Sequence, residues 1–441
     1  MRSTTGSSPV RSRAAPLLVA LAAIVPAAAP ASAQDVSAEV DELFGWVAPG
    51  APGCALAVSR NGEVVVDRAY GLANLETGTP IGPNTMFDIG SVQKQFDAAA
   101  ALLLVEDGRL SLAADIREYL QELPDYGHSI TLDHLMTHTS GVRDWTGLMN
   151  FTTGEEAALT LILRQRGLNF APGEEWLYSN SNYVLLKEIV ERVSGMPFSE
   201  LVRTRLFEPL GMEHTLYAAD IRAAETGALA YEPDRDAWRP AMMLGTERGG
   251  GAILSTVGDL LIWNDALTHG LLGEFVTDKL QEPARLNNGR ELTYARGLFV
   301  EDSPLGRAAW HTGSARAYKA LLSRLPEQGL SIAMLCNAGD AGERGLAGRR
   351  VADLFIPDDV LAAAEATERS EAAAPRAVDV PPAARAGLYF REDSAEWLRL
   401  IARDGTLRVA GGPMLVAVSE DRFRNPDGTP FFMSEDEFEL L

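Results

Sequence analysis

Residues 86–96 read MFDIGSVQKQF, and the apolar residues that follow them continue to a stop signal at Asp107-Gly108. This stretch predicts a helix that begins at Ser91 and extends to Glu106. Residues three apart on a helix lie on the same face, so Lys94 stands one turn above Ser91. The sequence therefore predicts a helix that begins with a hydroxyl and an amine side by side.

The pairing of Ser91 with Lys94 suits nucleophilic catalysis. A serine hydroxyl is a weak nucleophile until a neighbouring group takes its proton. A lysine can take that proton when burial lowers its pKa, whereas an arginine stays protonated. Four of the 39 basic residues are lysines (Lys94, Lys187, Lys279 and Lys319) and 35 are arginines, so the lysine at position 94 runs against the bias of the chain. The helix start also offers N–H groups to a developing oxyanion.

A second motif, Tyr178-Ser179-Asn180, lies further along the chain. A tyrosine phenol beside an ammonium group ionises more easily and can relay a proton. The amide of Asn180 offers both a donor and an acceptor to the amide of a substrate. We therefore predict that Tyr178 takes part in proton transfer and that Asn180 binds substrate.

The third motif is His311-Thr312-Gly313, in a segment with a strand pattern. His311 can supply a cation whose pKa responds to its surroundings. Thr312 can bind a carboxylate, and Gly313 allows a substrate to approach the backbone closely. Each motif alone is weak, but all three in this order would arise by chance in fewer than about one in a hundred such chains.

Strand patterns stand at both ends of the region 38–356, and helical patterns fill its middle. The strands at 54–59 and 63–69 are joined at Asn61-Gly62, which is typical of a tight hairpin. This order predicts an α+β fold, with a sheet built from both ends of the chain and a helical region inserted between them. The other expected helices are 35–47, 155–166, 181–195, 198–207, 257–268 and 342–355, and the other expected strands are 294–301, 308–312, 318–324 and 330–336.

The two ends of the chain have compositions of their own. Residues 1–33 combine arginines, an apolar run and a final Ala31-Ser32-Ala33, the pattern of an export signal cleaved before Gln34. An uncleaved N-terminal anchor is the alternative interpretation. Residues 359–385 are predicted to be an Ala-rich helix and linker, and 386–441 a small β appendage. The main domain would then be 34–358, in a periplasmic or secreted protein.

Charge and cysteine content narrow the possible partners. The net charge of −22 argues against binding to nucleic acid or to anionic lipid. No stable membrane span is expected once the signal is removed. The two cysteines, Cys54 and Cys336, could pair in an oxidising compartment, or they could be two small buried apolar residues.

Three further residues have more than one interpretation. His134 and His138 are four residues apart, which suits a metal site, but capping or packing is the favoured role because no His-Glu-x-x-His pattern is present. Arg296 could contact a substrate carboxylate, although a surface ion pair is favoured. We expect no metal and no cofactor.

Taken together, these motifs resemble the serine β-lactamase and D,D-peptidase superfamily in its class C-like branch, over roughly residues 38–356. The fold that the resemblance implies is a five-stranded antiparallel sheet flanked by helices, with a helical subdomain and the active site between them. The segments that carry the resemblance are 86–96, 134–142, Pro172-Gly173, 178–183, 207–212, Gly250-Gly251, Ser255-Thr256 and 311–313.

The resemblance implies a role for each motif residue. Ser91 would be the acylated nucleophile, with Lys94 and Tyr178 sharing proton transfer; which of the two is the base stays open. The backbone N–H groups of Ser91 and Ser314 would form the oxyanion hole. The substrate would be held by Asn180, Thr312, Gly313 and Ser314, with His311 beside the carboxylate.

The first residue of the third motif helps to distinguish between the reactions that members of this superfamily catalyse. Class C β-lactamases carry lysine there, whereas D,D-peptidases and D-aminopeptidases of this branch carry histidine, as at His311. The expected protein is therefore a serine hydrolase that acts on a peptide containing D-amino acids. The alternatives are an esterase of small esters or lactones, a β-lactamase, and a penicillin-binding sensor without turnover. The partner would be a small molecule or peptide, and the oligomeric state is left open.

Overall fold

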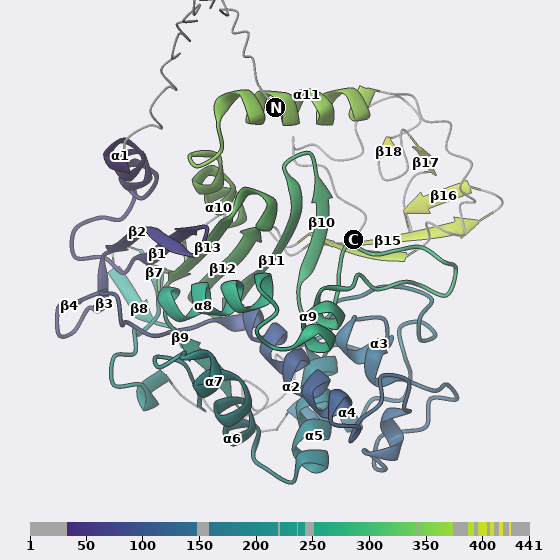
Figure 1. Ribbon diagram of the computed structural model, residues 1–441. Coiled ribbons are helices and arrows are strands. Elements are labelled where there is room, and N and C mark those ends of the chain that lie inside the picture. Colours follow the sequence, from purple (N-terminus) through teal and green to yellow (C-terminus); the bar gives the residue numbers. More distant parts are fainter. Residues whose placement is uncertain are drawn as a thin grey trace, which may run out of the picture.

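The computed structural model describes most of the chain up to residue 373 and short strands beyond it (Figure 1). The predicted export signal lies outside the described residues except for Ala33. The described ranges are 33–147, 158–218, 221–235, 237–242, 251–341, 344–373, 387–391, 396–403, 406–409, 414–417 and 423–424.

The core of the fold is a sheet of six antiparallel strands in the order β10-β11-β12-β13-β1-β2. Strands from both ends of the main domain meet where β1 pairs with β13, so the predicted assembly of the sheet is confirmed. The strands are β1 (Cys54–Arg60), β2 (Glu63–Tyr70), β10 (Phe299–Ser303), β11 (Gly306–Ala315), β12 (Tyr318–Leu325) and β13 (Leu330–Cys336).

The expected count of five strands is wrong by one, because β10 adds a strand at the edge of the sheet. The predicted strand at 294–301 begins only at Phe299. A turn precedes it, in which Ala295 N donates to Leu298 O and Gly297 has a φ of +88°. The chain reverses at this glycine, so residues 294–298 cannot extend β10.

Helices cover both faces of the sheet, as Figure 1 shows. On β1 the side chains of Leu56 and Val58 pack in a cluster with Val40 of α1 and Val351 of α10. The alternate residues, such as Ala57, belong to the larger cluster that includes α2 and α8. Because both faces are covered, the strand is apolar at every position along its middle.

The segment between β2 and β10 holds most of the helices. The predicted helix 91–106 begins as a short 3₁₀ turn, η1 (Gly90–Gln93), and continues as α2 (Lys94–Glu106). The other helices are α1 (Ala33–Leu43), α3 (Leu132–Met136), α4 (Ala158–Leu163), α5 (Asn180–Ser194), α6 (Phe198–Val202), α7 (Glu208–Leu210), α8 (Val257–Thr268), α9 (Glu274–Gln281), α10 (Arg344–Asp353) and α11 (Asp358–Ala373), with short turns η2 (Ile116–Glu118), η4 (Arg203–Phe207), η5 (Ile221–Ala223) and η7 (Pro326–Gln328).

Small sheets that the sequence did not predict support the helical segment. The strands β5 (Phe87–Asp88), β9 (Ala252–Ser255) and β6 (Leu216–Ala218) form one of them and hold the chain directly before Ser91. Two further pairs are β3 (Leu72–Asn74) with β4 (Thr79–Pro80) and β7 (Tyr231–Asp234) with β8 (Ala237–Pro240). Within the described part of the chain, no helix has both the length and the apolar composition that crossing a bilayer requires.

The C-terminal strands pair with one another in chain order. They lie within residues 386–441, the segment predicted to be a small β appendage. The domain boundaries at 358 and 386 stay predictions. The strands are β14 (Gly387–Arg391), β15 (Glu396–Arg403), β16 (Thr406–Val409), β17 (Met414–Ala417) and β18 (Phe423–Arg424).

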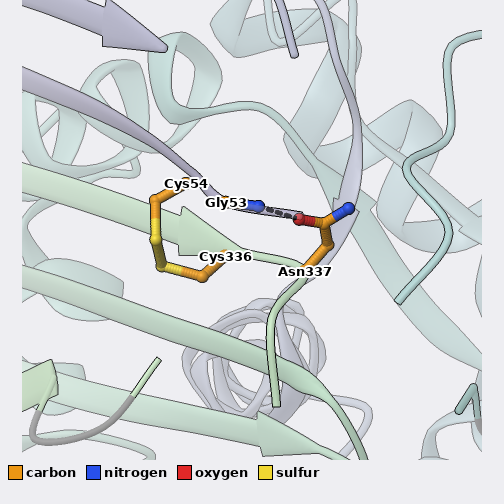
Figure 2. The surroundings of a disulfide bond; sticks show 4 residues. All are labelled: Gly53, Cys54, Cys336 and Asn337. Carbon is orange, nitrogen blue, oxygen red and sulfur yellow. Dashed lines mark hydrogen bonds between the residues drawn. A yellow bond between two sulfur atoms is a disulfide. The ribbon is translucent and has the colours of Figure 1, made fainter. Parts of the chain in front are cut away.

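The two cysteines form a disulfide between β1 and β13 (Figure 2). Cys54 and Cys336 stand directly opposite each other in the register of these strands. Beside them, the side chain of Asn337 accepts a hydrogen bond from Gly53 N at 2.8 Å and donates to the carbonyls of Leu72 and Leu229. Of the two interpretations of the cysteines, the pair is therefore the correct one, and it joins the two ends of the main domain.

The disulfide should make a large contribution to stability, because it closes a loop across a sequence separation of 282 residues. We expect the Cys54→Ala/Cys336→Ala variant to lose about 2–4 kcal/mol of the free energy of unfolding. Urea unfolding with and without a reductant measures this loss, and the reductant should affect only the wild type. Equal unfolding midpoints for the oxidised wild type and the variant would contradict the assignment.

Candidate active site

The site is built around the turn that carries Ser91. Gly90 has a φ of +53° and donates its N–H to Asp88 Oδ1 at 2.9 Å. A Cβ on Gly90 would lie 2.7 Å from Ser314 N, and one on Gly313 would lie 2.1 Å from Ile89 O. Only glycines at both positions let β11 press against the start of α2. The backbone amide of Ser314 is thereby brought beside the turn of Ser91, as the predicted oxyanion hole requires.

Lys94 lies between the first and second motifs. Its ammonium nitrogen donates to Ser91 Oγ at 3.1 Å and to Asn180 Oδ1 at 3.0 Å. Lys94 is 6% exposed, so the hydrogen bonds form largely out of water. The predicted neighbourhood of Ser91, Lys94 and Asn180 is therefore present in the structure.

Asp144 orients the amide of Asn180, a contact that no sequence motif predicted. Its Oδ2 accepts from Asn180 N at 2.9 Å and from Asn180 Nδ2 at 3.0 Å. Because the NH₂ group faces Asp144, the amide oxygen must face Lys94. Asp144 lies only two residues after the run 134–142, but no local pattern marks it as part of the site.

Tyr178 contributes its ring to the surroundings of Lys94. The Lys94 nitrogen lies 4.8 Å from the centroid of the Tyr178 ring and 5.4 Å from that of Tyr183. Aromatic rings at these distances attract an ammonium group. The structure thus brings Tyr178 to the lysine, while its part in proton transfer stays a prediction.

His138 fixes the backbone that leads to the second motif. Its ring centroid lies 4.3 Å from that of Tyr178, and its Nδ1 lies 3.3 Å from Ser179 N and 3.0 Å from Asn182 Nδ2. His138 is fully buried, so the predicted packing role is confirmed. The capping role predicted for His134 is also confirmed, because its side chain accepts from Thr131 N in a capping box.

His311 is fully buried next to Lys94 and a group of aromatic rings. Its Nδ1 faces the carbonyl of Thr312, so Nδ1 carries the proton and Nε2 accepts from the hydroxyl of Tyr294 at 3.4 Å. Burial, helped by the charge of Lys94, lowers the pKa of His311 to about 3, although the hydrogen bond to Thr312 opposes the change. The expectation of a cation at this position is therefore corrected: His311 is neutral at physiological pH.

This charge state can be tested by titration. The unfolded chain, in which histidine titrates near pH 6.5, should bind more protons than the folded chain between about pH 3 and 6.5. Stability is then unaffected above this window and falls as the pH drops through it, by up to about 1.4 kcal/mol per pH unit for His311. NMR spectra of the six histidines, with His311→Gln for assignment, should show no titration of His311 between pH 5 and 8. A midpoint near 6.5 would contradict the neutral assignment.

Ser314, directly after the third motif, contacts a second lysine that the sequence motifs did not include. Ser314 is exposed, and its Oγ accepts from the ammonium group of Lys319 at 2.9 Å. Lys319 stands opposite Ser314 in the register of β11 and β12. Thr312 is nearly buried, and its Oγ1 has no hydrogen-bond partner among the described residues. Directly after the motif, the hydroxyl group of Ser314 therefore contacts a positive charge.

Arg296 belongs to the scaffold. It is only 5% exposed, its Nε donates to Asp133 Oδ1 at 2.7 Å, and its Nη1 donates to Lys279 O at 2.6 Å. The predicted ion pair is present, but its predicted surface position is wrong, because α9 and the loop after it cover the guanidinium group.

The arrangement can activate a serine hydroxyl and stabilise an oxyanion, which is the chemistry of acyl transfer through a serine. Comparison with known proteins agrees with this interpretation of the site. The family model described as Beta-lactamase matches residues 35–355, so the chain belongs to the Beta-lactamase family.

Relatives of the chain include proteins of more than one kind. The chain is 28% identical over 305 residues to Penicillin-binding protein 4* of Bacillus subtilis, covering 63% of this chain and 66% of the relative. It is 30% identical over 319 residues to a D-aminopeptidase of Gluconobacter oxydans, covering 70% of this chain and 60% of the relative. The chain thus spans less than two thirds of the length of these curated relatives.

Solved structures share the fold. A penicillin-binding protein homologue from Pyrococcus abyssi, described as octameric, is 23% identical with a TM-score of 0.59, covering 89% of this chain and 92% of that one. A penicillin-binding protein from Bacillus halodurans is 24% identical with a TM-score of 0.59, covering 77% of this chain and 100% of that one.

Proposed function

We propose that the protein is a serine hydrolase that works through an acyl-enzyme on Ser91. The observation that carries the proposal is the hydrogen bond of 3.1 Å between the buried ammonium group of Lys94 and Ser91 Oγ. In a deprotonated state the same pair can pass the serine proton to the lysine, directly or through Tyr178. Membership of the Beta-lactamase family supports the proposal.

The reaction would proceed in two steps. Ser91 Oγ attacks the carbonyl carbon of the substrate, its proton passes to Lys94 or Tyr178, and the N–H groups of Ser91 and Ser314 stabilise the oxyanion. The leaving group departs with that proton. Water then attacks the acyl carbon of the ester on Ser91 and gives up a proton to the same base. The bond between the acyl carbon and Ser91 Oγ breaks, Ser91 Oγ takes that proton from the base, and the acid is released.

The substrate proposed is a peptide with D-amino acids and a free C-terminal carboxylate. The ammonium group of Lys319 donates to Ser314 Oγ, directly after the third motif. This positive charge would attract the carboxylate of a substrate and repel an N-terminal ammonium group. This observation favours a carboxypeptidase over the aminopeptidase that the Gluconobacter relative suggests. The absence of lysine at position 311 is a reason to expect weak β-lactam turnover.

A panel of substrates tests this preference. We expect hydrolysis of a peptide ending in D-Ala-D-Ala, slower hydrolysis of the same peptide with an amidated C-terminus, and little release from D-Ala-p-nitroanilide. Lys319→Met should raise KM for the free carboxylate about tenfold and leave the amidated peptide unchanged.

The matched control for this variant is Lys279→Met, because Lys279 forms an ion pair with Glu282 outside the site. Lys279→Met should change KM for neither the peptide with a free carboxylate nor the amidated peptide. Faster turnover of the p-nitroanilide, of nitrocefin or of p-nitrophenyl esters than of the D-Ala-D-Ala peptide would favour the aminopeptidase, the β-lactamase or the esterase. Stable acylation without turnover would favour the sensor.

We also propose that the mature chain is exported and begins at Gln34. The composition of residues 1–33 supports this proposal, and so does the disulfide, since disulfides persist in oxidising compartments. The intact mass of the exported protein tests it, and a mass that includes residues 1–33 would contradict it.

A further inference from the structure

A buried group of charges lies directly behind the Ser91–Lys94 pair. Asp97 follows Lys94 by three residues on α2, so both side chains share one face of the helix. Lys187 projects from α5 into the same region. Asp97 is 1% exposed and Lys187 is 8% exposed, so two lysines and one aspartate share an interior that excludes water.

Asp97 is held by hydrogen bonds on the side of its own helix. Gln93 Nε2 lies 3.2 Å from both carboxylate oxygens, and Gln93 Oε1 accepts from Ile253 N of β9 at 2.9 Å. The glutamine is thereby fixed between the helix and the small sheet. The carboxylate therefore has one defined position, on the same face of α2 as Lys94, whose charge it feels.

Lys187 supplies positive charge from the opposite helix. Its ammonium group donates to the hydroxyl of Tyr217 on β6 at 3.1 Å. Burial raises the pKa of Asp97 to about 6, and the charges of Lys187 and Lys94 oppose this rise. The carboxylate is therefore ionised at pH 7.5. Within the described part of the chain, further titratable groups face these three charges: Tyr183, Tyr217 and Glu191 near Asp97 and Lys187, and Tyr178, His138 and His311 near Lys94.

A carboxylate in such a position acts on the protonation of its neighbours. In the interior of a protein, an opposite charge a few ångströms away favours the charged form of a lysine, typically by about one pKa unit or more. The same negative charge opposes ionisation of a nearby tyrosine. Either way, an ionised Asp97 raises the pH at which the serine proton can be taken, whether Lys94 or Tyr178 takes it.

We propose that Asp97, held by Gln93 and faced by Lys187, is a positioning residue that sets the pH range in which Lys94 and Ser91 become reactive. The proposal rests on the proposed function, because it concerns the same nucleophile. Asp97 acts through the group that takes the proton of Ser91, and not on the substrate. If Asp97 and Lys187 had a structural role alone, removing either one would alter the stability of the protein and leave the pH range in which Ser91 reacts unchanged.

The test uses the full chain and two readouts in Asp97→Asn, which keeps the shape of the side chain. The first is the pH dependence of the rate at which a fluorophosphonate labels Ser91. The second is competitive acetylation of the four lysines with acetic anhydride, resolved by peptide mass spectrometry, which titrates Lys94 without turnover. Both midpoints should move down by about one pH unit or more, so Ser91 should be labelled about tenfold faster on the acid side.

Two comparisons control the experiment. Lys279, in its exposed ion pair, should titrate identically in all variants. Asp259→Asn removes another buried carboxylate, which lies on α8 and accepts from Thr215 Oγ1 and from His214 N. That variant should lower stability without moving either midpoint. Unchanged midpoints in a folded Asp97→Asn would overturn the proposal.

Lys187→Met provides a second variant if Asp97→Asn does not fold. Without the cation, Asp97 should stay protonated to higher pH, so below about pH 7 the labelling rate should approach that of a chain without the carboxylate. A labelling curve that superimposes on the wild type would overturn the proposal. If the wild type is not labelled at all, the proposed function fails, while the titration of Lys94 still decides the role of Asp97.

Discussion

The Ser91→Ala variant should lose about four orders of magnitude in kcat on any substrate that the protein turns over. The reason is that the acyl-enzyme can form only on Ser91 Oγ, and the oxyanion hole and substrate binding alone give little residual rate. The comparison to make is steady-state hydrolysis of the D-Ala-D-Ala peptide by wild type and variant, together with fluorophosphonate labelling. The variant should take up no label.

Ser111→Ala is the matched control, because Ser111 is an exposed serine away from the site. It should retain wild-type kinetics and labelling. If Ser91→Ala lost less than about tenfold in kcat, or if both variants were labelled equally, the nucleophile would lie elsewhere.

The Lys94→Arg variant should lose about three orders of magnitude in kcat/KM, although it keeps the positive charge. An arginine stays protonated in proteins and cannot take the proton of Ser91, nor can it share one with Tyr178. Its planar guanidinium group also cannot reproduce the geometry of an ammonium group that donates to both Ser91 Oγ and Asn180 Oδ1. Single-turnover acylation at several pH values measures the loss.

Lys94→Met removes the positive charge as well as the group that can take a proton. Its kcat/KM should fall to a similar extent as that of Lys94→Arg. Lys279→Arg is the control for the same substitution in a surface ion pair and should be silent. A Lys94→Arg variant within about tenfold of wild type would mean that Lys94 acts as a fixed charge and that proton transfer belongs to another group.

Local patterns predicted most of the elements of the main domain. Asn61-Gly62 marked the hairpin of β1 and β2, and both residues have positive φ angles of 51° and 80° as such a turn requires. The spacing of Ser91 and Lys94 was enough to predict that the two side chains meet, and they do. These features depend on residues close in the chain, which is where sequence patterns are informative.

The residues that sequence reasoning missed act across long distances in the chain. Asp144 contacts Asn180 from a loop, Lys319 reaches Ser314 across a pair of strands, and Lys187 approaches Asp97 from another helix. Nothing in their neighbourhoods distinguishes them from other charged residues. The charge state of His311 was also out of reach, because it depends on complete burial by rings that come from several segments.

The scarcity of lysine takes on a fuller meaning in the structure. Of the four lysines, Lys94 contacts the nucleophile, Lys187 faces Asp97 behind it, and Lys319 contacts Ser314 directly after the third motif. Lys279 is the one that lies in a surface ion pair. In a chain with 35 arginines, three lysines therefore gather at or behind the site, where a compact ammonium group or a removable proton is useful.

The mass of the chain during turnover tests the acyl-enzyme on Ser91 without reliance on any variant. The mature protein is mixed with a D-Ala-D-Ala peptide or its ester analogue, quenched in acid within the first turnovers, and digested for peptide mass spectrometry. We predict the mass of the acyl group on the peptide that contains Ser91, and its loss when substrate is exhausted. Turnover with the acyl group on another residue, or with no adduct at any time, would contradict this prediction.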